Sequence, residues 1–187
     1  MSKYEVSKGK FLLSIILGVV LVGINAYLLI QNRRLSSSID DVLEASHLNS
    51  GAIVSTLRGV DIEGHNVIID YVEGDRKTVL FIFTPDCGYC EQIMPFWQGI
   101  SEKIDRRAFR VFAVSLKSDG TKEFVSRYRL TSSPVLEKVY FEGSNSYKFS
   151  QTPETVLIDA DGKVEKVWKG PPDEKAKKEI EVALARS

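Results

Sequence analysis

Residues 78–100, TVLFIFTPDCGYCEQIMPFWQGI, decide how the rest of the chain is interpreted. The run at 78–83 is continuously apolar and rich in β-branched and aromatic residues, which is typical of a strand buried on both faces. Thr84-Pro85-Asp86 interrupts this run. Beyond it, apolar residues recur at helical spacing, at Ile93, Phe96, Trp97, Ile100 and Ile104. The stretch therefore predicts a strand, a short turn and a helix that begins at Cys87.

The two cysteines of Cys87-Gly88-Tyr89-Cys90 fall in the first turn of this predicted helix. The first thiol would lie beside unsatisfied backbone N–H groups and at the positive end of the helix dipole, and both favour the thiolate. A thiolate is the nucleophile of thiol–disulfide exchange. The second thiol would lie one turn further in, placed to attack a mixed disulfide. We therefore predict a redox-active disulfide, with Cys87 attacking and Cys90 resolving.

A structural disulfide and half of a zinc site are the alternatives for this pair. A disulfide that closes so short a loop adds little stability. Zinc needs two further ligands, and the only histidines, His47 and His65, do not have finger-like spacing. Redox exchange is thus favoured, and we expect neither a metal nor a cofactor.

From residue 51 onward the pattern alternates between strands and helices. A βαβ unit is followed by an antiparallel hairpin with an Asp-Gly turn and by a last helix, which Asp173 caps. This order predicts a mixed sheet with helices on both faces. The expected strands are Ile53–Val60, Val67–Tyr71, Thr78–Phe83, Phe109–Leu116, Thr155–Asp159 and Val164–Trp168, and a short helix is expected at Thr121–Leu130.

The CxxC helix with Pro95 eight residues after Cys87 resembles the kinked active-site helix of thioredoxins. Thr152-Pro153, ahead of an apolar strand, resembles the loop of that fold that carries a cis-proline. The segment at 130–136, the later TPETVLIDADGKV and the N-terminal hairpin look like the membrane-anchored TlpA/ResA branch. The resemblance covers about residues 52–185 and implies a three-layer α/β/α fold with a mixed central sheet and an N-terminal β-hairpin.

The resemblance also implies roles for these residues. Pro153 would be cis and face the Cys87 sulfur, and Thr152 would pair with the backbone of a protein partner. Gly88 and Tyr89 would contact the same partner. The implied activity is reduction of protein disulfides outside the cytoplasm, for example in cytochrome c maturation, with electrons from a membrane donor.

Two positions depart from the thioredoxin pattern. Asp86 stands where thioredoxins usually have Trp, and its carboxylate should oppose formation of the Cys87 thiolate. Phe81 stands where many thioredoxins carry a buried acid, so the proton acceptor for Cys90 is unassigned. Glu137 and Glu142 are candidates, although a solvated surface position is the expectation for both.

The N-terminal part predicts a membrane anchor. Residues 11–30 carry no charge, and a helix of 20 residues spans about 30 Å, the thickness of the hydrocarbon core of a bilayer. A cleaved signal peptide, the alternative, has a shorter apolar run and small residues before the cut. We predict a cytoplasmic tail at 1–10, a signal anchor at 11–30, a polar tether at 31–50 and a thioredoxin-like domain at 51–187. Lysines precede the span, which favours an extracytoplasmic domain on a single-pass membrane protein.

Positive and negative charges balance in this chain, and two further functions are open to its cysteine pair. The 187 residues hold 25 Lys and Arg against 25 Asp and Glu, so we expect no nucleic-acid partner. A thiol peroxidase is one alternative, because Thr84 and Cys87 match half of the peroxiredoxin motif, although Leu80 replaces its proline. A Cu(I) carrier is another, because two thiolates suit soft Cu(I).

Overall fold

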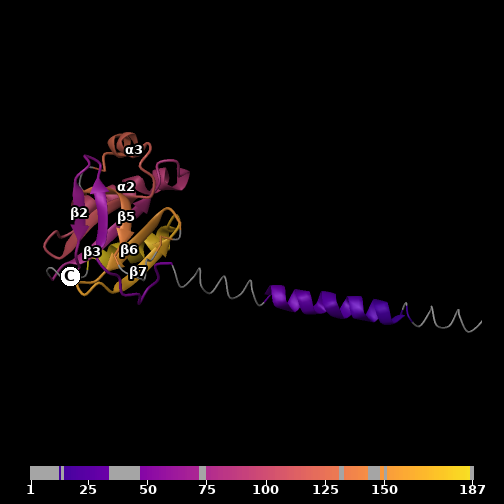
Figure 1. The fold of residues 1–187 in the computed structure, drawn as a ribbon. Helices are drawn as coiled ribbons and strands as arrows, with labels where there is room; N and C mark the ends of the chain where they lie inside the picture. The colour runs from indigo at the N-terminus through magenta and orange to yellow at the C-terminus, as the bar shows by residue number, and fades with distance from the viewer. Residues whose placement is uncertain are drawn as a thin grey trace, which may run out of the picture. The chain divides into compact units, whose positions relative to one another are not determined.

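The computed structural model of the chain describes residues 13, 15–33, 47–71, 75–130, 133–142, 148–149 and 151–185. The chain divides into two compact units, Met1–Ala45 and Ser46–Ser187. In the first, Ile15–Arg33 forms a helix with a mean hydropathy of 1.9, long and apolar enough to cross a membrane (Figure 1). A signal sequence would have the same properties. The expected tail at 1–10 and the greater part of the tether at 31–50 lie outside the described residues.

The second unit is built on one seven-stranded mixed sheet with the order β2-β1-β5-β4-β3-β6-β7 (Figure 1). The central pair, β3 and β4, is parallel, and β6 lies antiparallel on the other side of β3. Its elements are β1 (Leu57–Asp61), β2 (Asn66–Ile69), β3 (Lys77–Phe83), α2 (Gly88–Lys103), β4 (Phe109–Ser115), α3 (Thr121–Tyr128), β5 (Val135–Phe141), β6 (Glu154–Ile158), β7 (Val164–Lys169) and α4 (Glu174–Ala185). The thioredoxin-like α/β fold, the mixed sheet and the N-terminal hairpin are confirmed.

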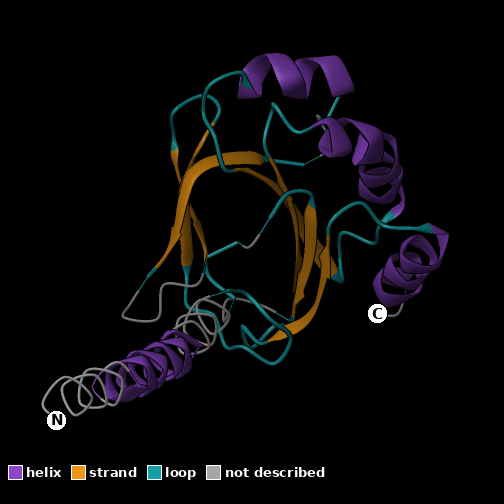
Figure 2. Ribbon diagram, turned by 90° about the vertical axis from the view of Figure 1, so that its right-hand side faces the viewer, coloured by secondary structure: helices purple, strands orange, loops and turns teal. Residues whose placement is uncertain are grey.

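The structure differs from the expectation of helices on both faces of the sheet. Buried side chains of α2, α3 and α4 all join one apolar cluster, on the face of β3 that carries Phe81 and Phe83. Figure 2 shows these helices outside the curved sheet. The chain passes from β3 to β4 and from β4 to β5 in the same direction across the sheet. Two right-handed crossovers in one direction place their helices on one face.

A second apolar cluster fills the opposite face, around Leu80 and Ile82 of β3. Among the described residues this cluster contains no helical side chain. Leu48 and Val54, from the segment before β1, cover it together with inward-facing residues of β1, β2 and β5. Leu48, which falls within the range predicted as a polar tether, is fully buried in the domain.

The sequence analysis did not predict strand β5. Its sequence, VLEKVYF, carries two charged residues in the middle, which hides the apolar alternation of a strand. The strand also contains a bulge, because the pairing with β1 shifts by one residue between Arg58 and Val60. Lys138 adopts a positive φ of 51° at this bulge. Gly59 lies opposite, and a Cβ there would be only 2.8 Å from Cγ1 of Val139.

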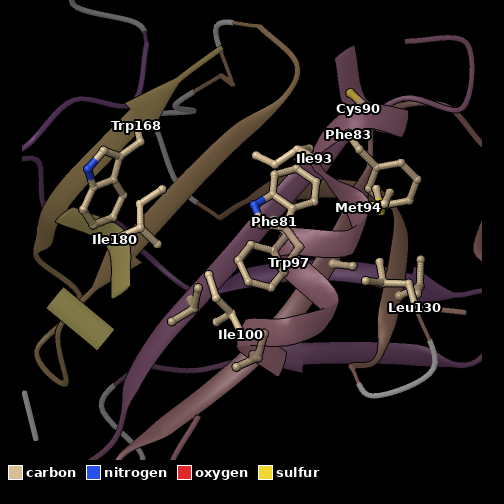
Figure 3. Packing of buried hydrophobic residues seen from close by; sticks show 14 of the residues in the cluster. Phe81, Phe83, Cys90, Ile93, Met94, Trp97, Ile100, Leu130, Trp168 and Ile180 are labelled. Carbon is tan, nitrogen blue, oxygen red and sulfur yellow. The ribbon is translucent and has the colours of Figure 1, made fainter. Parts of the chain in front are cut away.

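The cluster on the helical face fixes the position of α2 (Figure 3). Trp97 is fully buried, stacks on Phe81 with 4.9 Å between ring centroids, and donates its indole N–H to Oγ1 of Thr155 over 3.0 Å. The helix is therefore held to both β3 and β6. The inward stripe predicted for this helix is confirmed at Ile93, Trp97 and Ile100, whereas Phe96 and the C-cap residue Ile104 are only partly buried. The Asp173 cap of the last helix is also confirmed, since its carboxylate accepts the N–H of Ala176 over 2.8 Å.

Gly59→Ala tests the close approach of β1 and β5. The added methyl group collides with Val139 and the Glu137 carbonyl, so we expect a loss of about 1–3 kcal/mol in the free energy of unfolding. Gly99→Ala is the matched control, because a Cβ there meets no atom within 4 Å and alanine favours the helix by about 0.5–1 kcal/mol. Thermal unfolding of the full-length chain in detergent measures both. Equal stability of the two variants would contradict the proposed contact.

Candidate active site

Cys87 is the N-cap residue of α2. The helix itself begins at Gly88, one residue later than predicted. Its Sγ accepts the backbone N–H of Cys90 over 3.2 Å, and its thiol donates to the carbonyl of Thr152 over 3.6 Å. The side chain is partly exposed. The Cys87 sulfur thus lies between a helix N-terminus and the loop before β6.

Cys90 is in a different environment, although only two residues separate the two cysteines. Its side chain is fully buried in the cluster on the helical face. Burial and, second, the hydrogen bond with Cys87 raise the pKa of the Cys90 thiol to about 12. In the dithiol form, Cys87 is therefore partly exposed, whereas the Cys90 thiol is protonated and shielded.

The Thr152-Pro153 pair directly precedes β6, and the carbonyl of Thr152 lies next to Cys87. The peptide bond between the two residues is cis, as predicted. Pro153 is buried, Thr152 is half-buried, and the hydroxyl groups of Thr84 and Thr152 are 3.4 Å apart. Gly88 and Tyr89 are exposed at the start of α2. The loops that follow β3 and precede β6 therefore meet at Cys87.

Asp86, whose carboxylate was expected to oppose formation of the Cys87 thiolate, is largely exposed and has a partner of opposite charge. Its carboxylate forms an ion pair with the ammonium group of Lys117, which follows β4. The hydrogen bond from Lys117, and then one from Thr84, lower the pKa of Asp86. Sequence reasoning missed Lys117. The signal was available, because the carboxyl ends of neighbouring parallel strands meet at one edge of a sheet.

Neither carboxylate considered as a proton acceptor is among the groups that shift the pKa of the Cys90 thiol. The polar groups that influence its thiol are those of Cys87, Thr84 and Thr152. Glu142 pairs instead with Arg58 at the surface, and Glu137 lies on β5, opposite Val60. Phe81, at the position of the usual acid, is fully buried and stacked on Trp97.

Glu154 is a buried carboxylate that the sequence analysis did not single out. It directly follows Pro153 and is fully buried at the start of β6. Side chains alternate along a strand, and the next residue, Thr155, bonds to Trp97 on α2. Glu154 therefore belongs to the opposite face of the sheet from α2 and the two cysteines.

Among the described residues, the single group of three or more potential metal ligands is Asp61, Glu63 and His65, in which Asp61 is half-buried and the other two are exposed, and it does not include a cysteine. His47 instead lies beside Lys148. Leu80, at the position of the peroxiredoxin proline, is fully buried in the cluster opposite the helices.

Comparison with known proteins identifies the family. The profile of the Redoxin family matches residues 56–184. The chain belongs to the Redoxin family. Among curated protein sequences, none matches this chain. The matched range includes both cysteines, Lys117 and the Thr152-Pro153 pair, so the whole site lies within the Redoxin domain.

Solved structures share the fold of this Redoxin domain. One is the thioredoxin domain of a thiol-disulfide oxidoreductase from Bacteroides vulgatus, with 15% identity, a TM-score of 0.57, and coverage of 73% of this chain and 99% of that one. Another is a secreted disulfide oxidoreductase from Mycobacterium tuberculosis, with 19% identity, a TM-score of 0.53, and coverage of 70% and 95%. A third is a peroxiredoxin-like protein from Aquifex aeolicus, with 17% identity, a TM-score of 0.53, and coverage of 73% and 88%.

Membership of the Redoxin family confirms the expected class of enzyme, a thiol–disulfide oxidoreductase. The solved structures confirm the thioredoxin-like fold. The resemblance to the TlpA/ResA branch is confirmed at the level of the Redoxin family and the thioredoxin fold. The individual roles of the site residues, the partner and the cellular side remain predictions.

Alkylation distinguishes the two cysteines. We expect iodoacetamide at pH 7 to modify Cys87 at least about 100-fold faster than Cys90, because Cys90 is buried and its raised pKa keeps the thiol protonated. Labelling of Cys90 should accelerate as the pH rises toward 12, since the thiolate fraction grows tenfold per pH unit below the pKa. Peptide mass spectrometry of the reduced full-length chain measures both rates, and the denatured chain is the control. Equal labelling of the two cysteines in the native chain would contradict the assignment of Cys87 as the accessible thiol.

Proposed function

We propose that the chain is a membrane-anchored thiol–disulfide oxidoreductase that reduces disulfides of extracytoplasmic proteins. The observation that carries this proposal is the unequal burial of the two sulfurs at the start of α2. Cys87 is partly exposed and accepts a backbone N–H, while Cys90 is fully buried directly behind it. Exchange through a mixed disulfide needs one accessible nucleophile and one shielded resolving thiol.

The reaction follows from these positions. The Cys87 thiolate attacks one sulfur of the partner's disulfide, which forms a mixed disulfide and releases the other partner sulfur as a thiolate. The Cys90 thiol then loses its proton, and its sulfur attacks Cys87 Sγ. The second partner sulfur leaves as a thiolate, and the Cys87–Cys90 disulfide forms. Two electrons pass to the partner, and a membrane dithiol donor would restore the reduced enzyme.

The loop before β6 is the proposed binding site for the partner's backbone. The Thr152 carbonyl lies 3.6 Å from Cys87 Sγ, so an extended segment next to a disulfide could pair with Thr152 when its sulfur reaches Cys87. Pro153 has no N–H and therefore leaves the pairing to Thr152. Gly88 and Tyr89 would contact the same segment, since both are exposed beside Cys87.

Trapping tests the proposed roles. Cys90→Ser in the full-length chain should accumulate mixed disulfides with protein partners, because the resolving step is removed. Cys87→Ser should form none and should lose at least about 100-fold in reduction of a protein disulfide, since its nucleophile is missing. Non-reducing gels and mass spectrometry identify the adducts. Mixed disulfides in Cys87→Ser but not in Cys90→Ser would exchange the two roles. If Cys87→Ser still forms mixed disulfides and still reduces the protein disulfide, the proposed reaction is refuted.

Fractionation tests the anchor. We expect the mature chain to retain the helix Ile15–Arg33 and to remain in the membrane fraction after a carbonate wash, because the segment is apolar and long enough to span. A truncated chain that begins near residue 35 should be soluble and folded. The C-terminal domain should be accessible to a protease added outside the cytoplasm. A mature N-terminus near residue 27 would show instead that the helix is a cleaved signal.

A further inference from the structure

The ion pair of Asp86 and Lys117 lies beside Cys87 and has no part in the exchange reaction described above. Asp86 directly precedes the N-cap residue of α2, and Lys117 lies two residues after the end of β4. The side chains are 61% and 56% exposed, so solvent reaches both charges. An ion pair of this exposure adds little to the stability of the fold.

The main chain of Lys117 is held firmly. Its carbonyl accepts hydrogen bonds from Oγ of Ser115 over 2.5 Å and from Oγ1 of Thr121 over 2.6 Å. Both hydroxyl groups belong to fully buried residues. A Cβ on Gly120, which has a φ of +79°, would be 3.5 Å from Pro85, so this loop packs on the loop that carries Asp86. Formation of the ion pair therefore costs less conformational entropy than it would between residues on two mobile loops.

The charge of Asp86 matters because of its position. A carboxylate next to Cys87 disfavours the Cys87 thiolate, and an ammonium group on that carboxylate removes this effect. The other groups around Cys87 do not substitute for Lys117. The Cys90 thiol and the Thr152 carbonyl are uncharged, and Glu91, whose N–H bonds to the Cys87 carbonyl, carries a second negative charge.

We propose that Lys117 is a positioning residue of the exchange reaction: by pairing with Asp86 it cancels the negative charge that directly precedes Cys87 in the chain and would otherwise oppose the nucleophilic form of that thiol. This inference rests on the proposed role of Cys87 as the nucleophile. It assigns a function to a residue on a different element of the fold, which reaches the sulfur only through Asp86.

The pH profile of Cys87 alkylation tests the inference, in full-length chains that carry Cys90→Ser so that one thiol reacts. Lys117→Gln should raise the midpoint by about 0.5–1 pH unit, which slows alkylation at pH 7 by roughly 3- to 10-fold. Lys117→Arg, the matched control, keeps the charge and should keep the midpoint. Asp86→Asn combined with Lys117→Gln should restore the midpoint of the parent chain, because the unpaired carboxylate is then also removed. At about 1 M salt the difference between Lys117→Gln and the parent should disappear, because both charges are exposed and screened.

An unchanged midpoint in Lys117→Gln, or an equal shift when Asp86→Asn is also present, would overturn the inference. A purely structural role of Lys117 would slow alkylation without moving the midpoint, and this result would overturn it too. Reduction of a protein disulfide, measured on the same Lys117 variants with Cys90 retained, separates this test from the proposed function. If the parent chain reduces no protein disulfide while the midpoint shifts as expected, the exchange reaction fails and the action of Lys117 on Cys87 stands.

Discussion

Complete enclosure of β3 is the constraint on which the rest of the domain depends. The strand is paired along its full length with β4 and over five residues with β6, and its residues from Thr78 to Phe83 are buried. A buried strand needs partners on both edges for its backbone N–H and C=O groups. The neighbours of β3 are therefore fixed in register. The carboxyl end of β4, at Ser115, and the start of β6, at Glu154, meet β3 where it ends.

The site follows from this edge. Because β3 ends at Phe83 and α2 begins at Gly88, Cys87 lies between the loop that leaves β4 and the loop that enters β6. The first loop supplies Lys117 and the second supplies Thr152, and both contacts are made by residues just outside the sheet. Trp97 holds the helix against β3 and β6 from the side, through Phe81 and Thr155. Contact with these strands buries the first turn of α2 at Cys90 and leaves Cys87 partly exposed, a difference that a free helix would not produce.

The replacement of an acid by Phe81 fits this packing. A carboxylate at that position would lie among the aromatic and aliphatic residues of the helical face, where an ion is costly to bury. With an aromatic ring there, Trp97 gains a stacking partner and Cys90 has no neighbouring base on β3. The charges of the site are displaced to its rim, where Asp86 and Lys117 are solvated and paired. The domain thus separates an apolar resolving thiol from a polar, charged surface around the attacking one.

The sequence by itself determined the features that depend on local pattern. The apolar run at 78–83, the helical stripe after Cys87 and the Asp173 cap are set by neighbours in the chain, and each formed the expected element. The order of the two cysteines within the first helical turn also follows from sequence, because the backbone of a helix start is the same in any context. Tertiary structure decided the rest. Strand β5 exists because β1 and β4 both pair with it, despite the charges in its sequence, and its bulge needs Gly59 on the partner strand. The placement of all described helices of the domain on one face depends on the direction of two crossovers, which no local pattern encodes. The pairing of Asp86 with Lys117 joins residues 31 positions apart, and only the parallel register of β3 and β4 brings them together.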